Sequence, residues 1–164
     1  MEPTLHLHEF FVEGSNPELS HVLLNITEPS TPAEIDKGYF FAICEINNAE
    51  TKYIAKMQNI IDEIENTYYE TPNQIGQTAM ETVLEKVNQE SLSMVQPEIS
   101  LHCIVGAIRK DDIIFSFYGY PQMMLFYKTK DELYKKMDLI DQNKPGEQSQ
   151  KNQLFSQIIQ GKIG

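Results

Sequence analysis

Apolar residues in the first half of the chain change from a continuous run to a helical repeat. Residues 38–44 are almost all apolar or aromatic, which predicts a strand buried on both faces at the centre of a sheet. Beyond them, apolar side chains recur every three or four residues, the period of one helix face: Ile54, Met57, Ile61, Ile64 and Tyr68. We expect a helix over about 48–69, with Asn47 and Glu50 as an approximate capping pair.

A second apolar stripe follows and predicts another long helix. Thr71 and Pro72 offer an N-cap and a first-turn proline. The stripe behind them contains Ile75, Ala79, Val83, Leu84 and Val87. Before residue 38, alternating patterns predict strands over 5–12 and 21–27, and 28–33 reads as a loop.

Three runs of β-forming residues dominate the second half. Residues 99–108, 113–119 and 123–127 are separated by short turns, which predicts a three-stranded antiparallel meander. The polar segment 141–153 has no apolar period and reads as a mobile loop. Residues 154–159 resume an amphipathic pattern, which we interpret as a last short helix.

This order of elements predicts an α+β fold, in which two long helices cover one face of antiparallel β-sheet. At 164 residues, the chain is long enough for one ordinary domain, so we expect a single domain over 1–164. The opposite face of the sheet needs a second sheet or a partner to cover it.

Charge narrows the range of partners. The net charge of −11 opposes binding to nucleic acid or anionic lipid, so we expect neither. The N-terminus does not resemble a signal peptide, and no apolar stretch approaches a membrane span, which predicts a cytoplasmic location. Cys44 and Cys103 lie in apolar strand patterns, and we expect them to be buried, reduced thiols.

Two stretches resemble parts of the PPM-type (protein phosphatase 2C-like) metal-dependent phosphatases. Residues 38–48 look like the family's central strand, which enters an Asp-Gly-x-Gly-Gly turn, and the meander resembles one whose third turn carries Gly-Asp-Ser. Residues 154–163 resemble the segment before the family's Pro-Gly-Asp turn. The resemblance spans roughly residues 5–164 and implies part of an α-β-β-α sandwich, with the family's later metal aspartates lying beyond Gly164.

The chain departs from this family at the metal site. The resemblance implies a pair of divalent ions held by aspartates, because hard cations prefer oxygen ligands. Here the first turn reads Glu45-Ile46-Asn47-Asn48, and the second reads Gly119-Tyr120-Pro121. We therefore interpret the chain as a degenerate, truncated member without a cofactor: a pseudophosphatase that acts as a protein-binding or regulatory module.

Two other interpretations stay open. Glu45, His6 and His8 are the candidate metal ligands of a hydrolase with a non-standard site, which would use Mg²⁺, Mn²⁺ or Zn²⁺. Glu45 also fits a carboxylate that caps the following helix. Alternatively, the chain is an unrelated α+β scaffold that forms a homodimer by completing its sheet.

Aromatic and thioether side chains occur close in sequence to Gly119-Tyr120-Pro121. Tyr118, Tyr120 and Met123 are our candidates for contact with a protein partner, since such side chains are frequent at protein interfaces. His102 lies in an apolar strand, and we expect a hydrogen-bonded structural residue there instead of a catalytic base.

Overall fold

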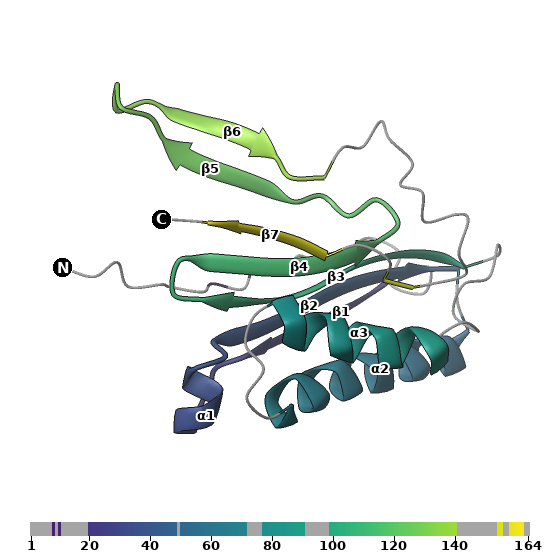
Figure 1. Cartoon of the computed structure of the whole chain (residues 1–164). Coiled ribbons are helices and arrows are strands. Elements are labelled where there is room, and N and C mark those ends of the chain that lie inside the picture. The colour runs from purple at the N-terminus through teal and green to yellow at the C-terminus, as the bar shows by residue number, and fades with distance from the viewer. Residues whose placement is uncertain are drawn as a thin grey trace.

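The structure, a computed structural model, describes residues 8, 10, 20–48, 50–71, 77–90, 99–140, 154–155 and 158–162 (Figure 1). It confirms a mixed α+β fold with antiparallel sheets. The elements in chain order are β1 (Ser20–Thr27), α1 (Pro32–Ile35), β2 (Tyr39–Asn47), α2 (Thr51–Glu70), α3 (Gln77–Glu90), β3 (Ser100–Arg109), β4 (Asp112–Tyr118), β5 (Met124–Lys128), β6 (Tyr134–Asp138) and β7 (Ile158–Lys162).

The main sheet has five strands in the order β1-β2-β3-β4-β7, and every neighbouring pair is antiparallel. β2 lies inside this sheet, as its apolar run predicts. It is buried on both faces only in its first half, because Phe40, Phe41 and Ala42 are buried whereas Ile43 is 45% exposed. The second half of β2 alternates between buried and exposed residues. On the face of the sheet that points away from α2 and α3, called the helix-free face below, the described residues therefore do not cover this half of the strand.

The helices α2 and α3 lie side by side along one face of the main sheet (Figure 1). Most of the apolar stripe predicted for α2 is buried there, and the described part of the α3 stripe lies beside it. These side chains pack against alternate residues of the central strands, which form one continuous core. Its fully buried members include Phe40, Cys44, Met57, Ile61, Ile64, Met80, Val83, Cys103 and Val105.

The predicted capping pair of Asn47 and Glu50 is wrong, whereas the predicted N-cap at Thr71 is not tested, because the start of its helix lies outside the described residues. Glu50 is the N-cap of α2 but makes no side-chain cap bond, and Asn47 Nδ2 donates instead to Glu45 Oε1 at 2.9 Å. Thr71 ends α2, since its backbone N–H and its Oγ1 both donate to the carbonyl of Thr67. Residues 72–76, where we predicted the start of the second helix, lie outside the described residues.

The segment 28–33, which the sequence predicts as a loop, contains the start of α1. Thr31 Oγ1 accepts from the Glu34 backbone N–H, and the Glu34 carboxylate accepts from the Thr31 N–H, which is a complete capping box. The buried Lys37 follows and donates from Nζ to the carbonyls of Tyr68, Tyr69 and Thr71 at 2.5, 3.0 and 2.5 Å. Burial lowers the pKa of Lys37. This ammonium thus joins the entry of β2 to the C-terminus of α2.

The predicted three-stranded meander is wrong in its third strand. β3 pairs with β4, but β5 pairs with β6 in a separate two-stranded sheet, and β7 occupies the edge of β4. The chain leaves the main sheet just after Gly119, whose backbone has a φ of +72° and lies against β3. A Cβ atom there would be 2.3 Å from the Leu101 carbonyl oxygen.

The last predicted helix is also wrong. The segment contains the start of β7, and Ile158 packs toward the main core while Ile159 packs toward the opposite face. Two β-branched residues that fill both faces at an open sheet edge favour a strand over a helix. The segments 5–12 and 141–153, predicted as a strand and a mobile loop, lie outside the described residues except for His8 and Phe10.

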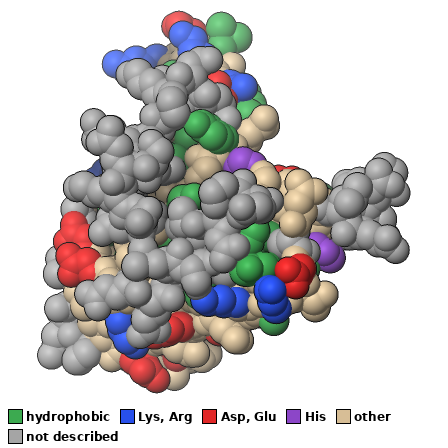
Figure 2. All heavy atoms as spheres, turned by 90° about the vertical axis from the view of Figure 1, so that its right-hand side faces the viewer, with side chains coloured by type: hydrophobic (Ala, Val, Ile, Leu, Met, Phe, Trp, Pro, Cys, Tyr) green, Lys and Arg blue, Asp and Glu red, His purple; other side chains and the backbone are tan. Residues whose placement is uncertain are grey.

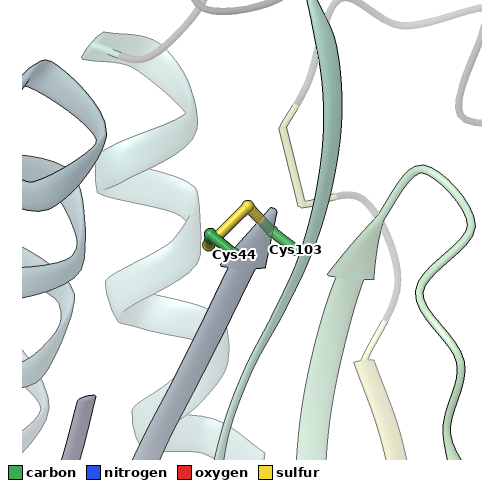
Figure 3. Close-up of a disulfide and its surroundings, with 2 residues drawn as sticks. All are labelled: Cys44 and Cys103. Carbon is green, nitrogen blue, oxygen red and sulfur yellow. A yellow bond between two sulfur atoms is a disulfide. The ribbon is translucent and has the colours of Figure 1, made fainter. Parts of the chain in front are cut away.

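Cys44 and Cys103 form a disulfide between β2 and β3 (Figure 3). They are register partners with a Cα–Cα distance of 4.1 Å, and neither side chain is exposed. The prediction of buried side chains is confirmed, whereas that of reduced thiols is wrong, because the strand register that brings the two sulfurs together is not visible in the sequence. In the described part of the chain, no helix has both the length and the apolarity needed to cross a membrane.

Candidate contact surface at the β5–β6 hairpin

The turn after β4 is held by a histidine. Tyr120 N–H donates to His102 Nδ1 at 2.9 Å, and His102 Nε2 lies 3.2 Å from Ser100 Oγ. Because Nδ1 accepts this bond, the proton of the neutral ring resides on Nε2, which donates to the serine oxygen. Both ring nitrogens of the half-buried His102 are therefore engaged, in keeping with a structural residue.

The base of the hairpin is seated on the helix-free face of the sheet. Leu139 N–H donates to the Met123 carbonyl at 2.9 Å, which closes the base. Met123, Leu139 and Ile140 then pack on a second, smaller core beneath them. The buried members of this core are Phe41, Ile104, Ile113, Phe115 and Ile140.

Beyond this base, the strands β5 and β6 stand away from the main sheet, on the side opposite to α2 and α3 (Figure 1). The tip is ordered by Thr129, whose N–H and Oγ1 both donate to the Leu133 carbonyl at 2.8 and 3.0 Å. Phe126, Leu133 and Tyr134 are 63%, 64% and 75% exposed. A two-stranded hairpin with this little packing is only marginally stable by itself.

The hairpin surface mixes apolar side chains with lysines. Residues 124–138 contain four of the chain's 13 basic residues, Lys128, Lys130, Lys135 and Lys136, and three acidic ones. Four positive minus three negative charges give +1, in a chain whose net charge is −11. Figure 2 shows hydrophobic, basic and acidic side chains together at the top of the molecule, where the hairpin lies in Figure 1. The hairpin is thus locally cationic on an acidic protein.

The structure separates the three predicted contact residues. Tyr120 is 46% exposed beside the hairpin base. Tyr118 is partly buried against the helix-side core, and this burial raises its pKa. Met123 is partly buried in the smaller core, so the exposed thioethers are those of Met124 and Met137.

Most of the exposed hairpin was missed by sequence reasoning. The outer strand β6 carries Tyr134, Lys135, Lys136 and Met137. The sequence shows only two short segments there, 131–134 and 137–140, each ambiguous between strand and turn. The signal that could have identified it is the repeat of a β-forming run, a polar turn at 129–133 and a second short run of matching length.

The structure places two of the three predicted metal candidates. Glu45 is exposed, and its Oε1 accepts a hydrogen bond from Asn47 Nδ2 at 2.9 Å. His8 is exposed, and His6 lies outside the described residues. Within the described ranges, no group of three or more His, Cys, Asp or Glu side chains is placed to hold a metal ion.

The two turns that the phosphatase resemblance singles out nevertheless lie close together. Glu45 is the register partner of His102, and the His102 ring accepts from Tyr120 N–H on its other side. The His102 and Tyr120 rings are 6.3 Å apart.

A second apolar surface occurs where β1 and β2 meet. Val22, Leu24 and Ile43 are 45%, 37% and 45% exposed on the helix-free face, and Leu24 is the register partner of Ile43. Among the described strands, β1 pairs only with β2.

Comparison of the chain with protein-family models, with curated proteins and with solved structures gave no match.

Proposed function

We propose that the chain is a non-catalytic, phosphatase-like domain that acts as a protein-binding or regulatory module. The observation that carries this proposal is the β5–β6 hairpin, which is anchored at its base and exposed along its length. The base holds the hairpin to a rigid sheet, so a partner would find a preorganised surface. Partner binding would in turn bury apolar side chains that the described chain leaves in water.

Two backbone conformations support the resemblance to PPM-type phosphatases. Asn48 has a φ of +58° at the position of a family glycine, and Gly119 has a φ of +72° where the family also has glycine. L-residues other than asparagine and aspartate rarely adopt this conformation. The turns therefore retain shapes that suit the family motifs, while Tyr120 stands at the position of a metal-binding carboxylate.

Metal and activity measurements test the non-catalytic part of the proposal. Calorimetric titration with Mn²⁺ and Mg²⁺ should show no binding, and an aryl phosphate should not be hydrolysed. Turnover that depends on either ion and is lost in Glu45→Ala would contradict the proposal. A Glu45→Asp/Tyr120→Asp variant, which adds carboxylates on both sides of His102, should gain weak cation affinity if the resemblance is correct.

Removal of the hairpin tests the binding part. In a variant whose residues 124–138 are replaced by a short glycine-containing turn, proteins cross-linked to the chain in its own cells should be lost selectively. Lys52→Glu is a suitable control, because it changes a 61% exposed lysine on α2, far along the chain from the hairpin. Unchanged recovery of every partner after hairpin removal would contradict the hairpin's role.

The apolar surface of Val22, Leu24 and Ile43 favours a second candidate function, that of a scaffold which dimerises through β1 and β2. Sedimentation velocity distinguishes the two functions. A mass that rises with concentration in the wild type, but not in Ile43→Lys, would support dimerisation, and a monomer at all concentrations would exclude it.

A further inference from the structure

We propose that the outer edge of β6 binds an extended, carboxylate-rich segment of a partner protein by strand addition. This inference rests on the proposed binding function and specifies the partner's chemistry. It begins from backbone groups, because an added strand is held mainly by main-chain hydrogen bonds.

The register of the hairpin shows which backbone groups are free. Thr129 donates to Leu133 and Leu139 donates to Met123, so the hydrogen-bonded pairs of this ladder are 123/139, 125/137, 127/135 and 129/133. The intervening residues of β6, Tyr134, Lys136 and Asp138, therefore direct their N–H and C=O groups away from β5. No described strand pairs with that edge. It forms a template for one more strand.

Side chains beside this edge determine the chemistry of the partner. Lys136 lies across from Phe126, and Lys128 across from Tyr134, so one face of the hairpin alternates cations with exposed aromatic rings. Lys135 lies on the other face, opposite Tyr127. Among the described residues, neither Lys130 nor Lys135 has an ion-pair partner, whereas Lys128 and Lys136 pair with Glu132 and Asp138. A segment that carries carboxylates at the positions opposite the lysines and apolar residues at the positions opposite the aromatic rings matches both features.

The same lysines disfavour two of the registers in which a second copy of the chain could pair at this edge. In the two antiparallel β6–β6 registers centred on the lysines, Lys136 faces Lys136 or Lys135 faces Lys135. Like charges placed directly opposite each other destabilise a strand pair. Nucleic acid and anionic lipid also carry negative charge, but the net charge of −11 on the whole chain opposes their approach.

Selection from a random peptide library displayed on phage tests this proposal with the full chain as bait. Peptides recovered by the wild type should be enriched in Asp and Glu together with apolar residues. Their affinity for Lys130→Glu/Lys135→Glu should fall by about tenfold or more, since two favourable charges become repulsive. Lys52→Glu, a control that reverses one exposed charge on α2, should bind as the wild type does.

The mode of binding is tested by Lys136→Pro against Lys136→Thr. Both variants remove the lysine charge, but only proline removes the outward N–H, and it does so without breaking a bond to β5. Strand addition predicts that Lys136→Pro binds the selected peptides several-fold more weakly than Lys136→Thr. Far-ultraviolet circular dichroism of the free variants verifies that both are folded.

Several outcomes would overturn the inference. They are recovery of peptides without acidic enrichment, equal affinities of Lys136→Pro and Lys136→Thr, stronger binding to phosphatidylserine vesicles or an oligonucleotide than to any peptide, and self-association through the hairpin. If these occur while hairpin removal still abolishes partner recovery in cells, the binding function stands and only the partner class is wrong. If hairpin removal also changes nothing, the proposed function fails with it.

Discussion

Strand β2 beneath the helices and strand β5 of the hairpin are both mostly apolar but lie in opposite environments. Phe40 on β2 is fully buried beneath the helices, whereas Phe126 on β5 is 63% exposed. The difference arises from the second layer, because α2 and α3 cover one surface and no described element covers the other. Apolar content alone thus does not determine whether a strand contributes to the core.

From this contrast we expect the helix-covered core to supply most of the folding stability and the hairpin to supply the binding surface. Residues under the helices contact many neighbours, so their loss opens cavities that the packed core cannot fill. The hairpin contributes little buried area, and its free energy of opening should lie well below that of the whole domain.

Truncation of one side chain in each region tests the division directly. Ile61→Ala in the core should lower the free energy of unfolding by about 2–5 kcal/mol, because a fully buried side chain leaves a cavity. Phe126→Ala should change it by no more than about 0.5 kcal/mol, as for other exposed sites. Urea denaturation measures both. Equal losses would show that the hairpin belongs to the cooperative core.

Reduction of the Cys44–Cys103 bond should weaken only the helix-covered region. The bond links strands 59 residues apart in sequence, and loop-closure entropy gives a stabilisation of about 4 kcal/mol or somewhat less. Adding dithiothreitol should lower the unfolding free energy of the wild type and leave Cys44→Ala/Cys103→Ala unaffected.

Mass spectrometry after alkylation measures whether the bond forms in cells. A cytoplasmic location, which the sequence predicts, favours the two thiols, whereas an oxidising compartment favours the bond. Complete alkylation of both cysteines in native protein would contradict the disulfide.

Alkaline pH should also act on the covered region. Burial raises the pKa of Tyr68 to about 12, against about 10 in an unfolded chain. The unfolded state loses this proton first, so the contribution is complete below pH 10 and is lost as pH rises through about 12. Two pKa units correspond to about 2–3 kcal/mol. Denaturation curves between pH 9 and about 12 should show this slope in the wild type and a smaller slope in Tyr68→Phe.

Sequence patterns located the elements whose periodicity decides their structure. The stripe of Met57, Ile61 and Ile64 identifies α2, because only a helix places such residues on one face. Long β-forming runs likewise identify β3 and β4. Each of these segments is long enough to distinguish the period of a helix from that of a strand.

The errors occur where contacts distant in sequence decide the outcome. The direction of β5 depends on how closely the Gly119 backbone approaches Leu101, and the strand at Ile158 depends on the free edge of β4. The disulfide depends on the register of β2 with β3. At the candidate site, Tyr120 was identified because its turn is distinctive, whereas β6 was not, since a short polar strand has no pattern of its own.

The smallest expected effect lies at the turn after β4, which connects the main sheet to the hairpin. His102→Leu removes the acceptor of the Tyr120 N–H, so the unfolding free energy should fall by only about 1 kcal/mol, the usual net value of a hydrogen bond that water can replace. Amide hydrogen exchange is the more sensitive measurement. The Tyr120 amide should exchange faster in His102→Leu, while Ser100→Ala, which removes only the partner of Nε2, should leave its protection nearly unchanged. If Tyr120 exchange is the same in all three proteins, the histidine does not anchor the turn, and the hairpin base is held by Met123 and Leu139 alone.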